Sequence, residues 1–184
     1  MRIIAGEFSS RKLETLPGEK TRPTLDKVKE AVFSSLGGFF DGGECLDLYA
    51  GSGAIGLEAL SRGIDHCVFG DRNPKAVAVI KRNIASLGVE DRCEVYCMKD
   101  FQLLEKLKED QKQFSLVYLD PPYEKEHNEE VISFLAQNHL LTKNARIIIE
   151  ARKEDVFSET IETVHKIKEA TYGICKIHYY QEGV

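Results

Sequence analysis

Hydrophobic and polar positions follow two different periods along most of the chain. Five short apolar runs are bounded by turn residues or charges, as buried strands are: Cys45–Tyr49, Cys67–Phe69, Val95–Met98, Leu116–Leu119 and Ile147–Ile149. Four stretches between them carry hydrophobic residues at helical spacing: Ile55–Ser61, Lys75–Leu87, Phe101–Lys108 and Glu129–Asn138. This alternation predicts an α/β fold, with a mostly parallel sheet covered by helices on both faces.

The two ends of the chain depart from this alternation. Near the N-terminus, Arg2–Ala5 and Lys12–Leu16 are short extended runs joined by a polar turn region, which predicts a small hairpin. We expect residues 1–22 to form this appendage and residues 23–184 to form the main domain. Near the C-terminus, Thr163–Ala170 and Ile174–Tyr180 follow each other without a helix between them. These two runs predict an antiparallel hairpin at the edge of the sheet.

Composition narrows the class of protein. The chain has 184 residues, 42% of them hydrophobic, and a formal net charge of −5, which argues against disorder and against a protein that coats nucleic acid. No apolar run reaches the roughly 18 residues of a membrane span, and the N-terminus lacks the apolar stretch of a signal peptide. The five cysteines include no CxxC pair, so we expect buried thiols in a reducing, cytoplasmic compartment.

A glycine-rich loop follows the first strand of the alternating region. Gly51, Gly53 and Gly56 match the G-x-G-x-x-G spacing between a strand and a helix, where glycine lets the backbone approach a ligand closely. Asp71 comes 20 residues after Gly51, at the end of the second strand, where a carboxylate can accept ribose hydroxyls. The loop predicts a nucleoside ligand, and a dinucleotide and S-adenosylmethionine both fit this pattern.

The fourth strand ends in a second motif, Asp120-Pro121-Pro122-Tyr123. The two prolines remove backbone donors and stiffen the loop, so that carbonyl groups can face a ligand. Asp120 and the Pro121 carbonyl can each accept one N–H of an exocyclic amine, while Tyr123 stacks on the base. Such acceptors would aim the nitrogen lone pair at an electrophilic methyl, which is catalysis by positioning.

The motifs DLYAGSGAIG, GDRNP, MKDF and LDPPY together resemble those of class I S-adenosylmethionine-dependent methyltransferases that modify amino groups. MRIIAGEFSSRKLETL, TRPTLDKVKEAVFSSL and GLEALSRG further resemble the RsmD-type bacterial methyltransferases, which make N2-methylguanosine in 16S ribosomal RNA. The resemblance covers nearly the whole chain and implies a Rossmann-like, seven-stranded sheet with an antiparallel last strand. Leu25 and Asp71 depart from the residues that are more usual at these positions, a small polar residue and Glu.

The resemblance also implies roles for individual residues. The glycine loop would line the methionine and ribose parts of S-adenosylmethionine, Asp71 would bind the ribose hydroxyls, and Asp100 would face the adenine amine beside Phe101. Asn83 would support the site structurally. The candidate cofactor-binding residues are Asp47, Tyr49, Ala50, Gly51, Ser52, Gly53, Asp71, Arg72, Asp100 and Phe101. The candidate catalytic residues, which would hold the guanine, are Asp120, Pro121, Pro122 and Tyr123.

The basic residues of the N-terminal segment are the candidates for contact with RNA phosphates. They are Arg2, Arg11, Lys12, Lys20 and Arg22. The expected partner is 16S ribosomal RNA or the assembling small subunit, and we expect a monomer. No two histidines are spaced as metal ligands are, so we expect no metal, and we assign no chemistry to His127.

Other functions share part of this pattern. An N-methyltransferase that acts on DNA adenine or on a protein amide would use the same cofactor and chemistry. An NAD oxidoreductase would share the glycine loop but leave the Asp120–Tyr123 motif unexplained, and an RNA-binding module without activity would not require an intact loop.

Overall fold

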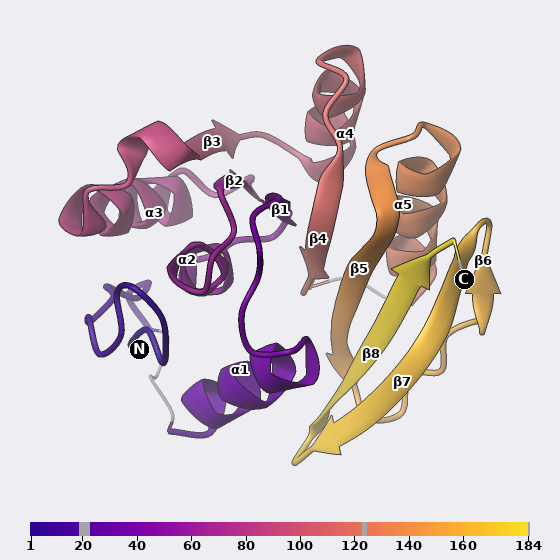
Figure 1. Cartoon of the computed structure of the whole chain (residues 1–184), viewed down its shortest axis with the longest axis horizontal. Coiled ribbons are helices and arrows are strands. Elements are labelled where there is room, and N and C mark those ends of the chain that lie inside the picture. The colour runs from indigo at the N-terminus through magenta and orange to yellow at the C-terminus, as the bar shows by residue number, and fades with distance from the viewer. Residues whose placement is uncertain (19–22, 123–124, 184) are drawn as a thin grey trace. The chain divides into compact units, whose positions relative to one another are not determined.

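The computed structural model describes residues 1–18, 23–122 and 125–183. The chain divides into two compact units, Met1–Lys99 and Asp100–Val184. In Figure 1 the first unit carries the indigo to magenta elements and the second unit the remaining ones. None of the helices in the described part of the chain combines the length and apolar character that a membrane crossing requires.

The first unit contains three parallel strands in the order β3-β2-β1. Its elements are α1 (Pro23–Ser35), β1 (Glu44–Asp47), α2 (Ala54–Ser61), β2 (His66–Asp71), α3 (Pro74–Leu87), the 3-10 turn η1 (Glu90–Arg92) and β3 (Cys93–Cys97). Strands and helices alternate as the sequence predicts, with boundaries that differ by a few residues. This is the βαβα arrangement that places helices on a parallel sheet.

Helix α3 illustrates how local sequence sets an element's bounds. The Asn73 side chain accepts a hydrogen bond from the Lys75 amide at the N-cap, Pro74 occupies the first helical turn, and Gly88 ends the helix in the left-handed conformation. Ala76, Ile80 and other apolar side chains of α3 are buried. The helix packs on β2, which precedes it in the chain, and on β3, which follows it.

The second unit holds the other strands in the order β4-β5-β8-β7-β6. Its elements are α4 (Asp100–Glu109), β4 (Phe114–Leu119), α5 (Lys125–Gln137), β5 (Leu141–Arg152), β6 (Thr160–Ile161), β7 (Val164–Tyr172) and β8 (Cys175–Glu182). Strands β7 and β8 form the expected antiparallel hairpin, and β8 also pairs antiparallel with β5. The last strand is therefore antiparallel, as the resemblance implied.

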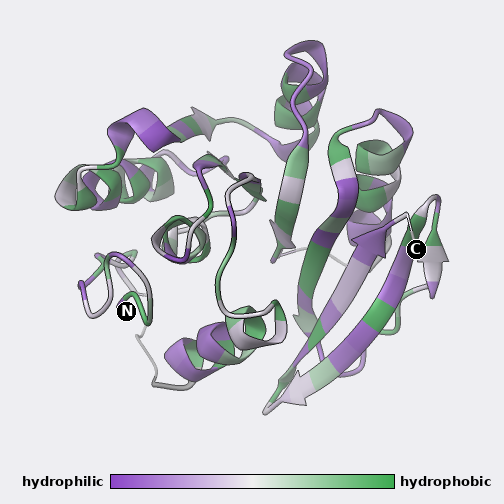
Figure 2. Ribbon diagram, in the orientation of Figure 1, coloured by the Kyte–Doolittle hydropathy of each residue, from purple (hydrophilic) through white to green (hydrophobic). Residues whose placement is uncertain are grey.

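The number of strands differs from the expected seven. The described residues contain eight, because Thr160–Ile161 pairs with the start of β7 as a two-residue strand. So short a run carries no periodicity that a sequence pattern could reveal. Strand β4 is mostly hydrophobic and buried, whereas β7 mixes hydrophilic and hydrophobic positions, as Figure 2 shows.

The N-terminal segment forms a looser hairpin than expected. Its two arms share a single antiparallel bridge, Arg2 with Lys12, flanked by backbone hydrogen bonds such as Ile3 N to Arg11 O at 2.9 Å. The first arm is also held by α2, because the amides of Ile4 and Ala5 donate to the Glu58 carboxylate. The predicted boundary after residue 22 stays a prediction.

All five cysteines are free thiols, as expected. The expectation that they are buried is met by Cys45 and Cys67, whereas Cys97 is exposed and Cys93 and Cys175 are half-buried. Strand β3 lies at the edge of the sheet, and Cys97 is its last residue, so neighbouring strands do not cover it as they cover residues of inner strands.

Candidate active site

The glycine loop joins β1 to α2 and brings the end of the strand against the helix. The side chain of Asp47, the last residue of β1, is buried, and its Oδ2 accepts a hydrogen bond from the Gly56 amide at 3.0 Å. Gly51 has φ 58°, in the left-handed region that favours glycine. At Gly56 a Cβ atom would lie 2.3 Å from the ring of Phe69, so only glycine lets α2 pack this closely on β2.

Asp71 and the glycine loop, predicted to cooperate, are in direct contact. The carboxylate of Asp71 at the end of β2 accepts from the Gly51 amide at 3.0 Å through Oδ2 and from the Asn73 amide at 2.9 Å through Oδ1. The amide of Ala50 donates to the Gly70 carbonyl at 2.8 Å, which ties the loop to the second strand. The loop and the acid thus form one group at the carboxyl ends of β1 and β2.

Burial changes the acidity of Asp47 within this group. Desolvation raises the pKa of Asp47 to about 7, the Gly56 hydrogen bond opposes the rise, and the charge of Asp71 adds to it. Two neighbouring carboxyl groups, one of them buried, favour a ligand that brings positive charge or several hydroxyl donors. A nucleoside with a cationic substituent has both.

The remaining loop residues hold the loop in place or flank it. Ala50 and Ser52 are buried, Tyr49 is half-buried and Arg72 is exposed. The side-chain amide of Asn83 donates to the carbonyls of Ser52 and Glu14, at 2.9 and 3.0 Å. Asn83 therefore links the N-terminal segment to the glycine loop, in agreement with the structural role that the resemblance implied.

In the second unit, Asp100 and Phe101 lie together at the start of α4. Oδ1 of Asp100 accepts from the Phe101 amide at 2.8 Å, and Oδ2 pairs with Nε2 of His127 on α5. The Phe101 ring stands edge-on to the His127 ring, with their centroids 5.6 Å apart. The sequence assigns no chemical role to His127, and its position along the chain, 27 residues from Asp100, gives no signal of this pairing.

The Asp120-Pro121-Pro122-Tyr123 motif begins directly after β4, as expected. Asp120 and Pro122 are exposed and Pro121 is half-buried, whereas Tyr123 lies outside the described residues. Within the strand, the Tyr118 hydroxyl donates to Glu150 on β5 at 2.6 Å. This bond between neighbouring strands fixes the segment from which the motif emerges.

The candidate RNA-binding residues divide into three groups. Arg2 and Lys12 are exposed and Arg11 is held against α3, where its guanidinium donates to the Ser86 carbonyl at 2.6 Å. Lys20 and Arg22 lie outside the described residues. The Arg11 side chain thus makes a hydrogen bond within the protein, which a count of basic residues could not reveal.

One buried cluster carries no signature in the sequence. Glu58 of α2 is fully buried and lies 3.2 Å from Nζ of Lys29 and 2.8 Å from Nε of Arg62. Its carboxylate also accepts the amides of Ile4 and Ala5. Glu58 lies within GLEALSRG, where the sequence offers an ordinary helical acid and no sign that three segments converge on it.

Comparison with known proteins agrees with this geometry. A family model described as conserved hypothetical protein 95 matches residues 1–181. A Haemophilus influenzae protein named ribosomal RNA small subunit methyltransferase D is 37% identical over 182 residues, covering 98% of this chain and 93% of the relative. The Escherichia coli K12 protein of the same name is 32% identical, covering 84% of this chain and 76% of the relative.

Solved structures give the same fold. A conserved hypothetical protein from Streptococcus pyogenes matches with a TM-score of 0.79 at 36% identity, covering 84% of this chain and 94% of that one. The SAM-dependent methyltransferase from Agrobacterium tumefaciens matches with a TM-score of 0.63 at 13% identity, over 89% and 63% of the two chains, a likeness of fold alone. The protein has the Rossmann-like α/β fold of class I methyltransferases. Within that class, the chain belongs to the conserved hypothetical protein 95 family. Its relatives there include the proteins named ribosomal RNA small subunit methyltransferase D.

Proposed function

We propose that the protein transfers a methyl group from S-adenosylmethionine to the exocyclic N2 amine of a guanine in 16S ribosomal RNA. The observation that carries the proposal is the contact between Asp71 and the Gly51 amide beside the buried Asp47, which suits a cationic nucleoside. The names of the relatives favour ribosomal RNA as the substrate. We place the protein in the cytoplasm, where such RNA is made, and expect it to act as a monomer.

The first unit is proposed to bind the cofactor. Asp71 would accept the ribose hydroxyls, and Asp47 with the backbone of residues 49–53 would bind the methionine end. Arg72 would flank the ribose. In the second unit Asp100 would accept the adenine amine and Phe101 would pack beside the ring. When bound, S-adenosylmethionine supplies an electrophilic methyl group on a sulfonium.

The residues after β4 are proposed to hold the base. Removing guanine from its stack costs on the order of a few kcal/mol, and stacking on Tyr123 recovers roughly 1–3 kcal/mol. Asp120 and the Pro121 carbonyl would each accept an N–H of the exocyclic amine, with Pro122 stiffening the turn. The proton is acidic once the nitrogen carries the methyl group, so Asp120 needs no strong basicity to accept it.

The test is methyl transfer from labelled S-adenosylmethionine to unmodified small ribosomal subunits, naked ribosomal RNA and DNA, followed by mass spectrometry of the nucleosides. N2-methylguanosine from the RNA samples is the expected product, and the ratio of subunit to naked RNA identifies the substrate state. N6-methyladenine from DNA, or a methylated protein amide, would move the target while keeping the cofactor. Absence of cofactor binding in calorimetry would favour an RNA-binding module instead.

Asp120→Ala is the variant that separates binding from chemistry. We expect it to bind the cofactor with unchanged affinity and to lose most methyl transfer, by a factor of about 10² or more. Asp41→Ala, at an exposed carboxylate outside the motif, is the matched control and should transfer methyl groups at the wild-type rate. Full activity of Asp120→Ala would contradict the proposed mechanism.

A further inference from the structure

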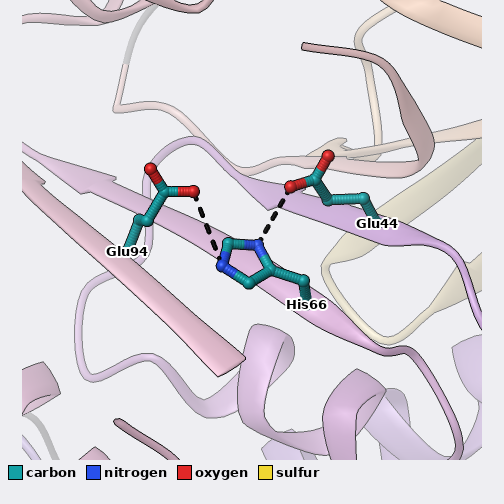
Figure 3. Close-up of side chains that lie close together, drawn as sticks. All are labelled: Glu44, His66 and Glu94. Atoms are coloured by element: carbon teal, nitrogen blue, oxygen red, sulfur yellow. Dashed lines mark ion pairs between the residues drawn. The ribbon is translucent and has the colours of Figure 1, made fainter. Parts of the chain in front are cut away.

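Three potential metal ligands meet at the start of the strands of the first unit. Glu44 opens β1, His66 opens β2 and Glu94 is the second residue of β3. One ligand atom of each lies within 4.8 Å of the others. Figure 3 shows both carboxylates turned toward the imidazole ring, with Glu44 Oε1 2.9 Å from Nδ1 and Glu94 Oε2 3.5 Å from Nε2.

Strand register places the three side chains on one face of the sheet. Glu44 and His66 are direct partners, and Glu94 is the partner of Val68, two residues beyond His66. Helix α2 packs on the opposite face, where Gly56 contacts Cys67 and Phe69. The cluster also lies at the amino ends of the strands, whereas Asp47 and Asp71 lie at the carboxyl ends, so it is separate from the proposed cofactor site.

The contacts of His66 and Glu94 within the cluster suit metal binding. Nδ1 of His66 is buried and makes no hydrogen bond with any described residue, although Glu44 Oε1 lies only 2.9 Å away, so the two groups are not aligned for a hydrogen bond. The Tyr96 hydroxyl donates to Glu94 Oε1 at 2.8 Å. Tyr96 thereby orients this carboxylate in the way that hydrogen bonds behind metal ligands do.

We propose that Glu44, His66 and Glu94 bind a divalent transition-metal ion, with Zn²⁺ the fitting choice. One imidazole nitrogen and two carboxylate oxygens form a donor set that Zn²⁺ accepts and that Mg²⁺ and Ca²⁺, which select oxygen ligands, do not favour. Water completes the four-coordinate shell. The two carboxylate charges balance the charge of the ion. An ion binds one imidazole nitrogen, whereas Glu44 faces Nδ1 and Glu94 faces Nε2, so metal binding requires one of these partly exposed side chains to rotate toward the nitrogen that the other faces.

A bound ion would link three strands of the first unit. Each ligand comes from a different strand of the β3-β2-β1 sheet, so the ion would join all three at their amino ends. An ion that binds the folded protein raises the free energy of unfolding in proportion to the logarithm of its concentration. Metal binding therefore stabilises the folded protein, and this effect does not depend on methyl transfer.

The test is metal binding by the full, untagged chain after treatment with a chelator. Calorimetry with Zn²⁺ should give a site with a stoichiometry of one that His66→Gln weakens by more than about a hundredfold and that Tyr96→Phe weakens about tenfold. His165→Gln, at a histidine in the second unit, is the matched control and should bind as the wild type does. Mg²⁺ should give no comparable heat.

Cobalt distinguishes this site from thiolate sites at the free cysteines. Co²⁺ bound by Glu44, His66 and Glu94 should show visible absorption without the near-ultraviolet bands of cysteine coordination, and His66→Gln should abolish that spectrum. Circular dichroism of each variant in metal-free buffer establishes that it is folded. Absence of stoichiometric Zn²⁺ binding by the wild type, or equal binding by a folded His66→Gln variant, would overturn the proposal, whatever the outcome for methyl transfer.

Discussion

The carboxylate of Glu58 and the ammonium of Lys29 lie 3.2 Å apart, and both side chains are almost wholly buried. Burial lowers the pKa of Lys29, and the charge and hydrogen bond of Glu58 oppose that shift. The same carboxylate accepts the amides of Ile4 and Ala5, so one side chain joins α1, α2 and the N-terminal segment. Buried charges of this kind are costly to leave without a partner.

Replacing Glu58 should therefore destabilise the protein strongly. Glu58→Gln leaves Lys29 and Arg62 buried beside a neutral amide, and we expect the free energy of unfolding to fall by about 3–5 kcal/mol. Urea titration followed by circular dichroism measures the change. Asp110→Asn removes the exposed ion pair of Asp110 with Lys106 and should cost less than about 1 kcal/mol. Equal effects of the two variants would contradict the structural role given to Glu58.

Cofactor affinity should depend on pH through Asp47. Burial raises the pKa of Asp47 from its ordinary 3.8 to about 7, so the protonated form is favoured in the free protein below pH 7. On the proposed assignment a cationic ligand prefers the carboxylate, and its affinity should fall up to about tenfold for each pH unit below 7 and level off above. Protein stability should change in the opposite sense. The raised pKa of Asp47 favours folding most at low pH, and this contribution to the free energy of unfolding is lost as the pH rises through 7.

Isothermal titration calorimetry between pH 5.5 and 8.5 measures this dependence directly. Asp47→Asn removes the titrating group and should give a weaker but nearly flat profile. An unchanged slope in Asp47→Asn would show that another group controls the pH dependence.

His127 should act on the cofactor through Asp100. Because the imidazole pairs with one oxygen of the Asp100 carboxylate, His127→Gln should leave that carboxylate less well oriented. We expect the KM for S-adenosylmethionine to rise about tenfold with a smaller change in kcat. His165→Gln is the control, and the double variant with Asp100→Asn should be no worse than Asp100→Asn alone. Additive losses would mean that His127 acts independently of Asp100.

Two exposed basic residues of the N-terminal segment should contribute to RNA affinity by charge. Replacing Arg2 and Lys12 by Gln should weaken RNA binding and reduce the slope of log K against log salt by about 1–2. Lys143→Gln with Lys153→Gln, at exposed positions of the second unit, is the control for overall charge. A slope that changes equally in both double variants would leave the segment without a specific role in RNA binding.

Local chemistry explains why much of the fold could be predicted. Helix α3 begins at an Asn-Pro cap and ends at a glycine, and Gly51 adopts a left-handed backbone conformation that favours glycine. The contact of Asp71 with Gly51 follows from the strand–loop–helix order, because parallel strands bring their carboxyl ends to one edge. These features depend on residues close in sequence or on rules of strand connection.

Residue patterns alone indicate the alternation of strands and helices, the glycine loop with its acid and the family of the chain. Contacts between distant polar residues follow only from the folded structure: Glu58 with Lys29, His127 with Asp100, and His66 with Glu44 and Glu94. The two-residue strand β6 likewise exists only because β7 is there to pair with it. Such contacts are set by strand register and helix packing between segments far apart along the chain, and no local pattern of residue types encodes that register.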